Sequence, residues 1–82
     1  MPETYSTSDI WLGSLFLTET DAELVRVQTH INGRKSVTFC FSGKGLSGLA
    51  EKYYSKEAQG NVAQIRENIN LLRDILFQAR KS

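Results

Sequence analysis

Hydrophobic and polar residues alternate position by position in the middle of the chain, over residues 23–42. The odd-numbered positions from 25 to 31 carry Val, Val, Thr and Ile, and those from 37 to 41 carry Val, Phe and Phe. A period of two is typical of β-strands that bury one face. The dipeptide Asn32-Gly33, a strong turn signal, separates the two segments. This stretch therefore predicts an antiparallel β-hairpin.

The register of the hairpin follows from the same pattern. Residues directly opposite each other in an antiparallel pair point to the same side, so the two apolar faces have to coincide. A two-residue turn would place Val27 opposite the polar Thr38. A three-residue loop over residues 31–33, with Gly33 left-handed in a bulge, brings the apolar faces together. The predicted pairs are Val25 with Phe39, Val27 with Val37 and His30 with Arg34.

The segment before the hairpin has the features of a helix. Ser6 and Asp9 have the spacing of a capping box, which predicts a helix from there to about residue 18. Gly13 in its interior costs about 1 kcal/mol relative to alanine, so we expect a close neighbour at that position. Trp11 lies at helical spacing among leucines and a phenylalanine, and we expect its side chain in the core.

Two further helices are predicted after the hairpin. The first covers residues 46–54, where Tyr54 is the expected exposed aromatic residue. Asn61 is a suitable N-cap for the second, which runs to about Arg80. The apolar residues of this last helix form one stripe at 3.6 residues per turn: Val62, Ile65, Ile69, Leu72, Leu76 and Ala79.

These elements predict a single α+β domain over residues 1–82, in the order α-β-β-α-α. The helices pack on the odd-numbered face of a two-stranded antiparallel hairpin. A lone hairpin is marginally stable and both of its strands are edges. We therefore expect a homodimer, formed either by strand edges that complete a four-stranded sheet or by the last helix. Three apolar residues outside the stripe are the candidates for self-association: Leu71, Ile75 and Phe77.

Composition and charge indicate the class of protein and the compartment in which we expect it. The chain has 82 residues, 40% of them hydrophobic and 23% charged, with a net charge of +1, as in ordinary globular domains. The single cysteine, Cys40, cannot form an internal disulfide, which favours a reducing cytoplasm. No segment has the pattern of a signal peptide or the apolar length of a membrane span. We expect a cytoplasmic protein without membrane association.

The charges are distributed unevenly along the chain. Residues 1–24 carry only acidic side chains, whereas residues 25–56 carry six basic side chains against Glu51 alone. A solvated surface accounts for this without any ligand. An anionic partner, nucleic acid in particular, is the alternative interpretation. The candidate contacts are Arg26, Arg34, Lys35, Lys44 and Lys52.

The segment from Gly43 to Gly48 matches G-x-G-x-x-G between a predicted strand and a predicted helix. A helix rather than a strand follows, so no dinucleotide-binding β-α-β unit is completed. Glycines of a tight turn are the simpler interpretation, although the helix start with Lys44 could hold a phosphate. His30 and Cys40 lack partners at catalytic or metal-binding spacings. We expect no enzyme activity, no metal and no cofactor.

Several features follow one another along the chain: Tyr5, Thr7, Asp9, Ile10, Gly13, Val37-Thr-Phe39-Cys-Phe41, Leu49, Tyr53-Tyr54 and Val62. In this order they resemble a small bacterial and phage domain family of unknown function, with an aromatic-x-Thr-x-Asp helix start, two strands and C-terminal helices. The segment 43–45 departs from the plainer turn of that family. The resemblance implies the fold and a bacterial setting, and it implies no functional residue.

Three functions remain open at this point. The first is a non-enzymatic interaction module that binds a protein partner through its dimer surface or the even-numbered face of the hairpin. The second is a nucleic-acid-binding accessory protein that uses the basic hairpin and the second helix. The third is a small enzyme or a phosphate-binding protein centred on residues 43–48.

Overall fold

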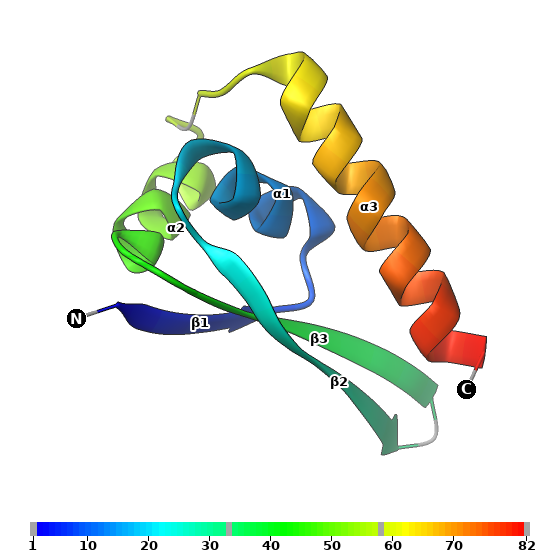
Figure 1. Cartoon of the computed structure of the whole chain (residues 1–82). Coiled ribbons are helices and arrows are strands. Elements are labelled where there is room, and N and C mark those ends of the chain that lie inside the picture. The colour runs from blue at the N-terminus through cyan, green and yellow to red at the C-terminus, as the bar shows by residue number, and fades with distance from the viewer. Residues whose placement is uncertain (1, 33, 58, 82) are drawn as a thin grey trace.

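Three helices cover one face of a three-stranded antiparallel sheet (Figure 1). The computed structural model of the chain describes residues 2–32, 34–57 and 59–81, with the backbone alone at positions 32, 34 and 35. The predicted α+β class is confirmed. The elements in chain order are β1 (Glu3–Thr7), α1 (Ile10–Glu19), β2 (Glu23–Asn32), β3 (Arg34–Gly43), α2 (Leu46–Tyr54) and α3 (Val62–Lys81).

Strand β1 is the element that the sequence analysis does not predict. Residues 3–7 are expected to lead into a helix, but they pair antiparallel with β3, from Glu3 opposite Gly43 to Thr7 opposite Phe39. Tyr5 is half-buried, and its ring packs edge-on against Phe16 at a centroid distance of 5.1 Å. The predicted order α-β-β-α-α and the two-stranded sheet are therefore wrong. The chain has the order β-α-β-β-α-α.

The start of α1 moves accordingly. Its N-cap is Asp9, whose Oδ1 accepts hydrogen bonds from the backbone N–H groups of Trp11 at 2.9 Å and Leu12 at 3.3 Å. Ser6, the predicted N-cap, instead donates from its hydroxyl to Cys40 Sγ at 3.2 Å. Because aspartate caps a helix as well as serine does, the later cap leaves residues 3–7 available for the sheet.

Strand β3 lies in the middle of the sheet, in the order β1-β3-β2. Since β1 and β2 are both antiparallel to β3, they run parallel to each other, and α1 connects them across the helical side of the sheet. The expectation that both hairpin strands are edges is therefore wrong for β3. Its odd-numbered side chains, Val37, Phe39 and Phe41, are buried under the helices, as predicted.

The hairpin keeps its predicted faces but not its predicted register. Val27 lies opposite Phe39, and His30 lies opposite Ser36. The predicted partners, Val37 and Arg34, are two positions away. A shift by two residues leaves every side chain on the same face, so the apolar faces still coincide. The bulge expected at Gly33 lies outside the described residues.

A β-bulge interrupts the start of β2. The register shifts between Leu24 and Arg26, so Val25 has no opposite residue. The extra residue reverses the alternation beyond it. Leu24, opposite Phe41, is half-buried and packs against the core, whereas Val25 is 55% exposed. The predicted pairing of Val25 with Phe39 is therefore wrong, because the shifted register alone would place Val25 opposite Phe41 and the bulge leaves it without an opposite residue.

A close approach of α1 to the sheet and to α3 explains the glycine in its interior. A Cβ atom at Gly13 would lie 2.9 Å from Phe41 Cζ and 3.0 Å from Leu72 Cδ1. The expected close neighbour is thus confirmed. The fully buried large side chains around this point are Phe16, Phe39, Phe41, Leu12, Leu46 and Leu72.

The last two helices begin and end close to their predicted bounds. Helix α2 covers the predicted residues 46–54, and α3 begins directly after Asn61, whose Oδ1 accepts a hydrogen bond from Gln64 N–H at 3.1 Å. As far as the chain is described, no helix combines the length and the apolar character needed to cross a membrane.

Candidate functional site

The basic residues proposed to contact an anion are spread along the length of β3 and into α2. Positions 34 and 35 begin β3 beside the hairpin turn, whereas Arg26 lies on β2 opposite Cys40, nearer the end of β3 at Gly43. Lys44 and Lys52 lie beyond that end, after β3 and in α2. Ten residues of strand span about 33 Å. The structure therefore does not bring the five residues together into one patch.

The start of α2, the proposed phosphate site, is occupied by a side chain of the protein itself. The Glu3 carboxylate accepts hydrogen bonds from Ser47 N–H and from Ser47 Oγ, both at 2.9 Å. The backbone N–H bond is the main reason why the pKa of Glu3 is lowered. Gly45, the N-cap, has a left-handed φ of 74°. The left-handed Gly45 thus belongs to the turn from β3 into α2, and the Glu3–Ser47 hydrogen bonds hold the start of α2 against β1.

The helices leave one face of the sheet uncovered (Figure 1). His30 and Cys40 lie on this face, because their positions alternate with those of Val37, Phe39 and Phe41 on the covered face. His30 is exposed opposite Ser36. Cys40 is only 7% exposed, because it sits between Ser6 on β1 and Arg26 on β2. Among the described residues, no three His, Cys, Asp or Glu side chains are grouped so that they could hold a metal ion.

The three candidate residues for self-association do not share one face of α3. At 100° per residue, Leu71 and Ile75 are about 40° apart, and Phe77 is about 120° from Leu71. Ile75 is half-buried beside β2, whereas Leu71 is 49% and Phe77 59% exposed. The Lys81 ammonium lies 4.6 Å from the centre of the Phe77 ring. The structure brings Leu71 and Ile75 together and separates Phe77 from them.

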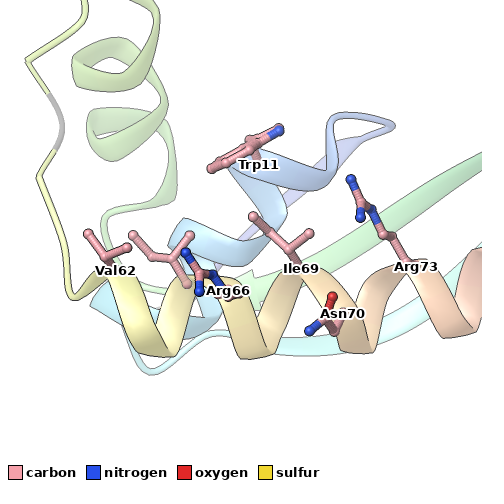
Figure 2. A pocket seen from close by; sticks show the side chains of 7 residues that line it. Trp11, Val62, Arg66, Ile69, Asn70 and Arg73 are labelled. Atoms are coloured by element: carbon pink, nitrogen blue, oxygen red, sulfur yellow. The ribbon is translucent and has the colours of Figure 1, made fainter.

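One of the large exposed side chains is a residue that the sequence analysis assigns to the core. Trp11, in the first turn of α1, is 57% exposed. Figure 2 shows its ring projecting from α1 above the side chains of α3. Tyr54 is 63% exposed, as expected. The core positions of α1 are taken by Leu12 and Phe16, which leaves Trp11 at the margin of the buried stripe.

The space beside this ring is a groove of about 400 Å³ between α1 and α3. We call it the Trp11 groove, and it is lined by Trp11, Val62, Ile65, Arg66, Ile69, Asn70 and Arg73 (Figure 2). A second hollow of about 310 Å³ shares Trp11 and Ile65 with it and reaches Lys56 and Tyr53. Most of the groove is apolar, and its polar groups lie along α3.

Two arginines give the Trp11 groove its charge. Arg66 and Arg73 are seven residues apart, which places them on the same side of α3 about 10 Å from each other. Neither guanidinium has an ion pair within the part of the chain that the structure describes. Figure 2 shows Arg73 extending from α3 toward the side of Trp11, and Arg66 lying closer to the α3 backbone. The groove thus combines an apolar floor with two uncompensated positive charges.

Hydrogen bonds hold α1 against both of its neighbouring helices, α2 and α3. Asp9 caps α1 and also accepts a bond from the Tyr53 hydroxyl of α2 at 3.0 Å. Burial, followed by this bond, raises the pKa of Tyr53. On α3, Asn68 Nδ2 donates to Thr18 Oγ1 at 2.8 Å, and these two residues tie α1 to α3. The groove therefore exists before any ligand arrives.

The chemistry of this site suits binding rather than catalysis. None of the residues that line the groove is a serine, cysteine or histidine that could act as a nucleophile or a general base. An apolar group that carries negative charge would contact both the apolar floor of the groove and the two arginines.

No family model, no curated protein and no solved structure matches this chain. The resemblance to a bacterial and phage domain family therefore stays a prediction.

Proposed function

We propose that this chain is a non-enzymatic interaction module that binds an acidic, amphipathic segment of another protein in the Trp11 groove. The observation that carries the proposal is the exposure of Trp11 between two arginines without ion pairs. Tryptophan and arginine dominate the binding energy of protein interfaces, because one supplies a large apolar surface and the other supplies directed hydrogen bonds.

The dimensions of the groove favour a helical partner. From Val62 to Arg73 the groove follows α3 for about 17 Å, which is three turns of helix. A partner helix that lies along α3 would present apolar residues to Trp11 and Ile69 at spacings of three and four. Carboxylates two turns apart on the partner would then match the spacing of Arg66 and Arg73. Such pairs are bidentate and charge-assisted.

Nucleic acid fits this site less well than a protein does. Binding to a phosphate backbone needs a continuous basic surface, and the five candidate basic residues are spread along the length of β3 and into α2 instead of forming one patch. Helix α3 also carries Glu67 and Asp74, and the net charge of the chain is only +1. Apart from the His30 imidazole, the described side chains on the uncovered face of the sheet, Ser6 and Ser36 among them, include no aromatic ring for stacking.

Photo-crosslinking in the cell that makes the protein tests the proposal. Benzoylphenylalanine at Asn70, an exposed residue of the groove, should capture a protein segment that contains both carboxylates and large apolar side chains. The matched control places the same group at Ser36, on the uncovered face of the sheet. Sequencing of the crosslinked peptide identifies the bound segment directly.

Charge reversal at the rim completes the test. The double variant Arg66→Glu and Arg73→Glu should fold normally, because both side chains are exposed, and should lose the crosslink at position 70. Arg26→Glu, on the uncovered face, should leave it unchanged. A crosslink to nucleic acid, a crosslink only from position 36, or capture that survives the double reversal would contradict the proposed site.

A further inference from the structure

Strand β2 leaves one edge of the sheet unpaired. It is ten residues long and lies at the end of the order β1-β3-β2. The other edge, β1, has only five residues, follows a proline and is tied to α2 through Glu3. Past the bulge at Val25, residues 26–32 of β2 pair regularly with β3 and contain neither Pro nor Lys. Most of the usual protections of an exposed edge are missing from this stretch.

Apolar side chains accompany this edge in both layers of the molecule. Ile31 on β2 is 80% exposed, and Leu71 on the neighbouring flank of α3 is 49% exposed. Between the two layers lies an open hollow of about 500 Å³, which Val27, Thr29 and Ile75 help to line. We call this surface the β2–α3 side, made of Val27, Thr29, Ile31, Leu71 and Ile75. A soluble monomer would leave its unpaired backbone and its apolar residues in water.

We propose that the β2–α3 side binds a second copy of this chain, with the two β2 strands antiparallel about a two-fold axis at Thr29. The axis follows from the length of the regular stretch, because Thr29 is the midpoint of residues 26–32. Pairing about it uses all seven residues and gives a continuous six-stranded sheet. This inference does not depend on the function proposed for the Trp11 groove.

The sequence of the edge is complementary to itself in this register. On the helical side Val27 faces Ile31 of the second copy, so the most exposed apolar residue of the strand is covered. On the other face Gln28 faces His30 of the second copy, and no two like charges stand opposite each other. The group that opposes pairing is Asp74, which lines the hollow in both copies. Salt should therefore strengthen the dimer by screening this repulsion.

The available area sets the expected affinity. Seven residues of strand extend about 23 Å, and the strand layer together with the helix layer above it is about 20 Å high. Roughly 500 Å² per copy, or about 1,000 Å² in total, would be buried, which is at the lower end of specific interfaces. The dimer should therefore be weak, with a dissociation constant of roughly 10–500 μM, and visible only at high protein concentration.

Sedimentation equilibrium over a wide concentration range measures this association. The 9.2 kDa chain should approach twice its mass at the highest concentrations. Ile31→Lys, a change at an exposed edge position, should weaken the dimer at least tenfold with an unchanged circular dichroism spectrum. Phe77→Lys, the matched change on the far flank of α3, should have no effect. A monomer at every concentration up to about 1 mM, or a dimer lost in Phe77→Lys instead of Ile31→Lys, would overturn the proposal.

A single cysteine tests the position of the axis. Opposite Cα atoms in an antiparallel pair are about 4.5–5.5 Å apart, within the range of a disulfide. In a Cys40→Ser background, Thr29→Cys should form a disulfide-linked dimer quickly on mild oxidation, because this residue faces itself. Val27→Cys and Ile31→Cys, each alone, should react slowly. Equal rates at the three positions would refute this register, and a faster Val27→Cys would place the axis elsewhere.

Discussion

Replacing Gly13 by alanine is expected to destabilise the protein, even though alanine favours helices more than glycine does. The added Cβ would lie 2.9 Å from Phe41 Cζ and 3.0 Å from Leu72 Cδ1. Both of these residues have no exposed surface, and the Phe41 ring packs edge-on against Phe16 at 5.4 Å. The ring therefore cannot move aside without disturbing a second aromatic ring.

The magnitude follows from two opposing terms. Overpacking a core by a methyl group costs about 1–3 kcal/mol, and the higher helix propensity of alanine returns about 1 kcal/mol. We expect a net loss of about 1 kcal/mol in the free energy of unfolding. Gly48, in α2, is the matched control, because a Cβ there meets nothing within 4 Å. Gly48→Ala should stabilise the protein by about 0.5–1 kcal/mol.

Urea unfolding followed by circular dichroism measures both variants under the same conditions. The two midpoints should move in opposite directions with unchanged m-values. For a domain of this size, about 1 kcal/mol corresponds to a shift of about 4–8 °C in the melting temperature. If Gly13→Ala were as stable as Gly48→Ala, the close packing of α1 against Phe41 and Leu72 would be refuted.

Three further predictions concern the bulge and two titrating groups. Leu24→Ala should cost about 1–2 kcal/mol in urea unfolding and Val25→Ala less than about 0.5 kcal/mol, and the reverse order would contradict the bulge. The lowered pKa of Glu3 stabilises the fold above the unfolded value of 4.5, and this contribution is lost as the pH falls through the folded pKa. Glu3→Gln should remove that part of the acid dependence, seen in urea midpoints between pH 2 and 6 (roughly). The raised pKa of Tyr53 stabilises the fold below the unfolded value of 10.0, and the contribution is lost as the pH rises through the folded pKa. Tyr53→Phe should flatten the alkaline decline of stability, and an unchanged decline would show that another group causes it.

The pattern of the sequence predicts those elements whose signals are local. The hairpin strands, α2 and α3 have clear periods of two or 3.6, and their bounds agree with the structure to within a residue or two. Strand β1 is different, because Ser6 and Thr7 serve equally well before a helix and inside a strand. Its partner, β3, lies more than 30 residues away in the chain. Only the three-dimensional pairing decides between the two uses.

The register shows a second limit of the same kind. The alternation of the hairpin fixes which face each side chain occupies, but it cannot distinguish two registers that differ by two residues. Val27 therefore faces Phe39 instead of Val37 without any change in the buried set. The sequence around Val25 contains no glycine or other turn residue that would indicate the bulge. Its effect, the exchange of Leu24 for Val25 in the core, appears only in the structure.

The sequence analysis does not predict the Trp11 groove, because the groove forms only where α1 and α3, which are distant in the chain, lie side by side. Trp11 has the spacing of a core residue, but Leu12 and Phe16 take the core positions of α1 and leave Trp11 at the margin of the buried stripe. Arg66 and Arg73 look like ordinary surface charges until α3 is placed beside α1. At residues 43–48 the sequence likewise does not show that a carboxylate 44 residues away, Glu3, accepts a hydrogen bond from Ser47 N–H at the helix start.

The fluorescence of Trp11, the single tryptophan of the chain, tests the central claim that its groove binds apolar anions. The probes are 8-anilinonaphthalene-1-sulfonate and N-phenyl-1-naphthylamine, which differ only in the sulfonate. Because two exposed arginines contribute about 0.2–1 kcal/mol each, the sulfonate should bind roughly two- to thirtyfold tighter. The preference should disappear in the double variant Arg66→Gln and Arg73→Gln. Equal affinities in the unaltered protein, or a preference that persists in the variant, would contradict the account.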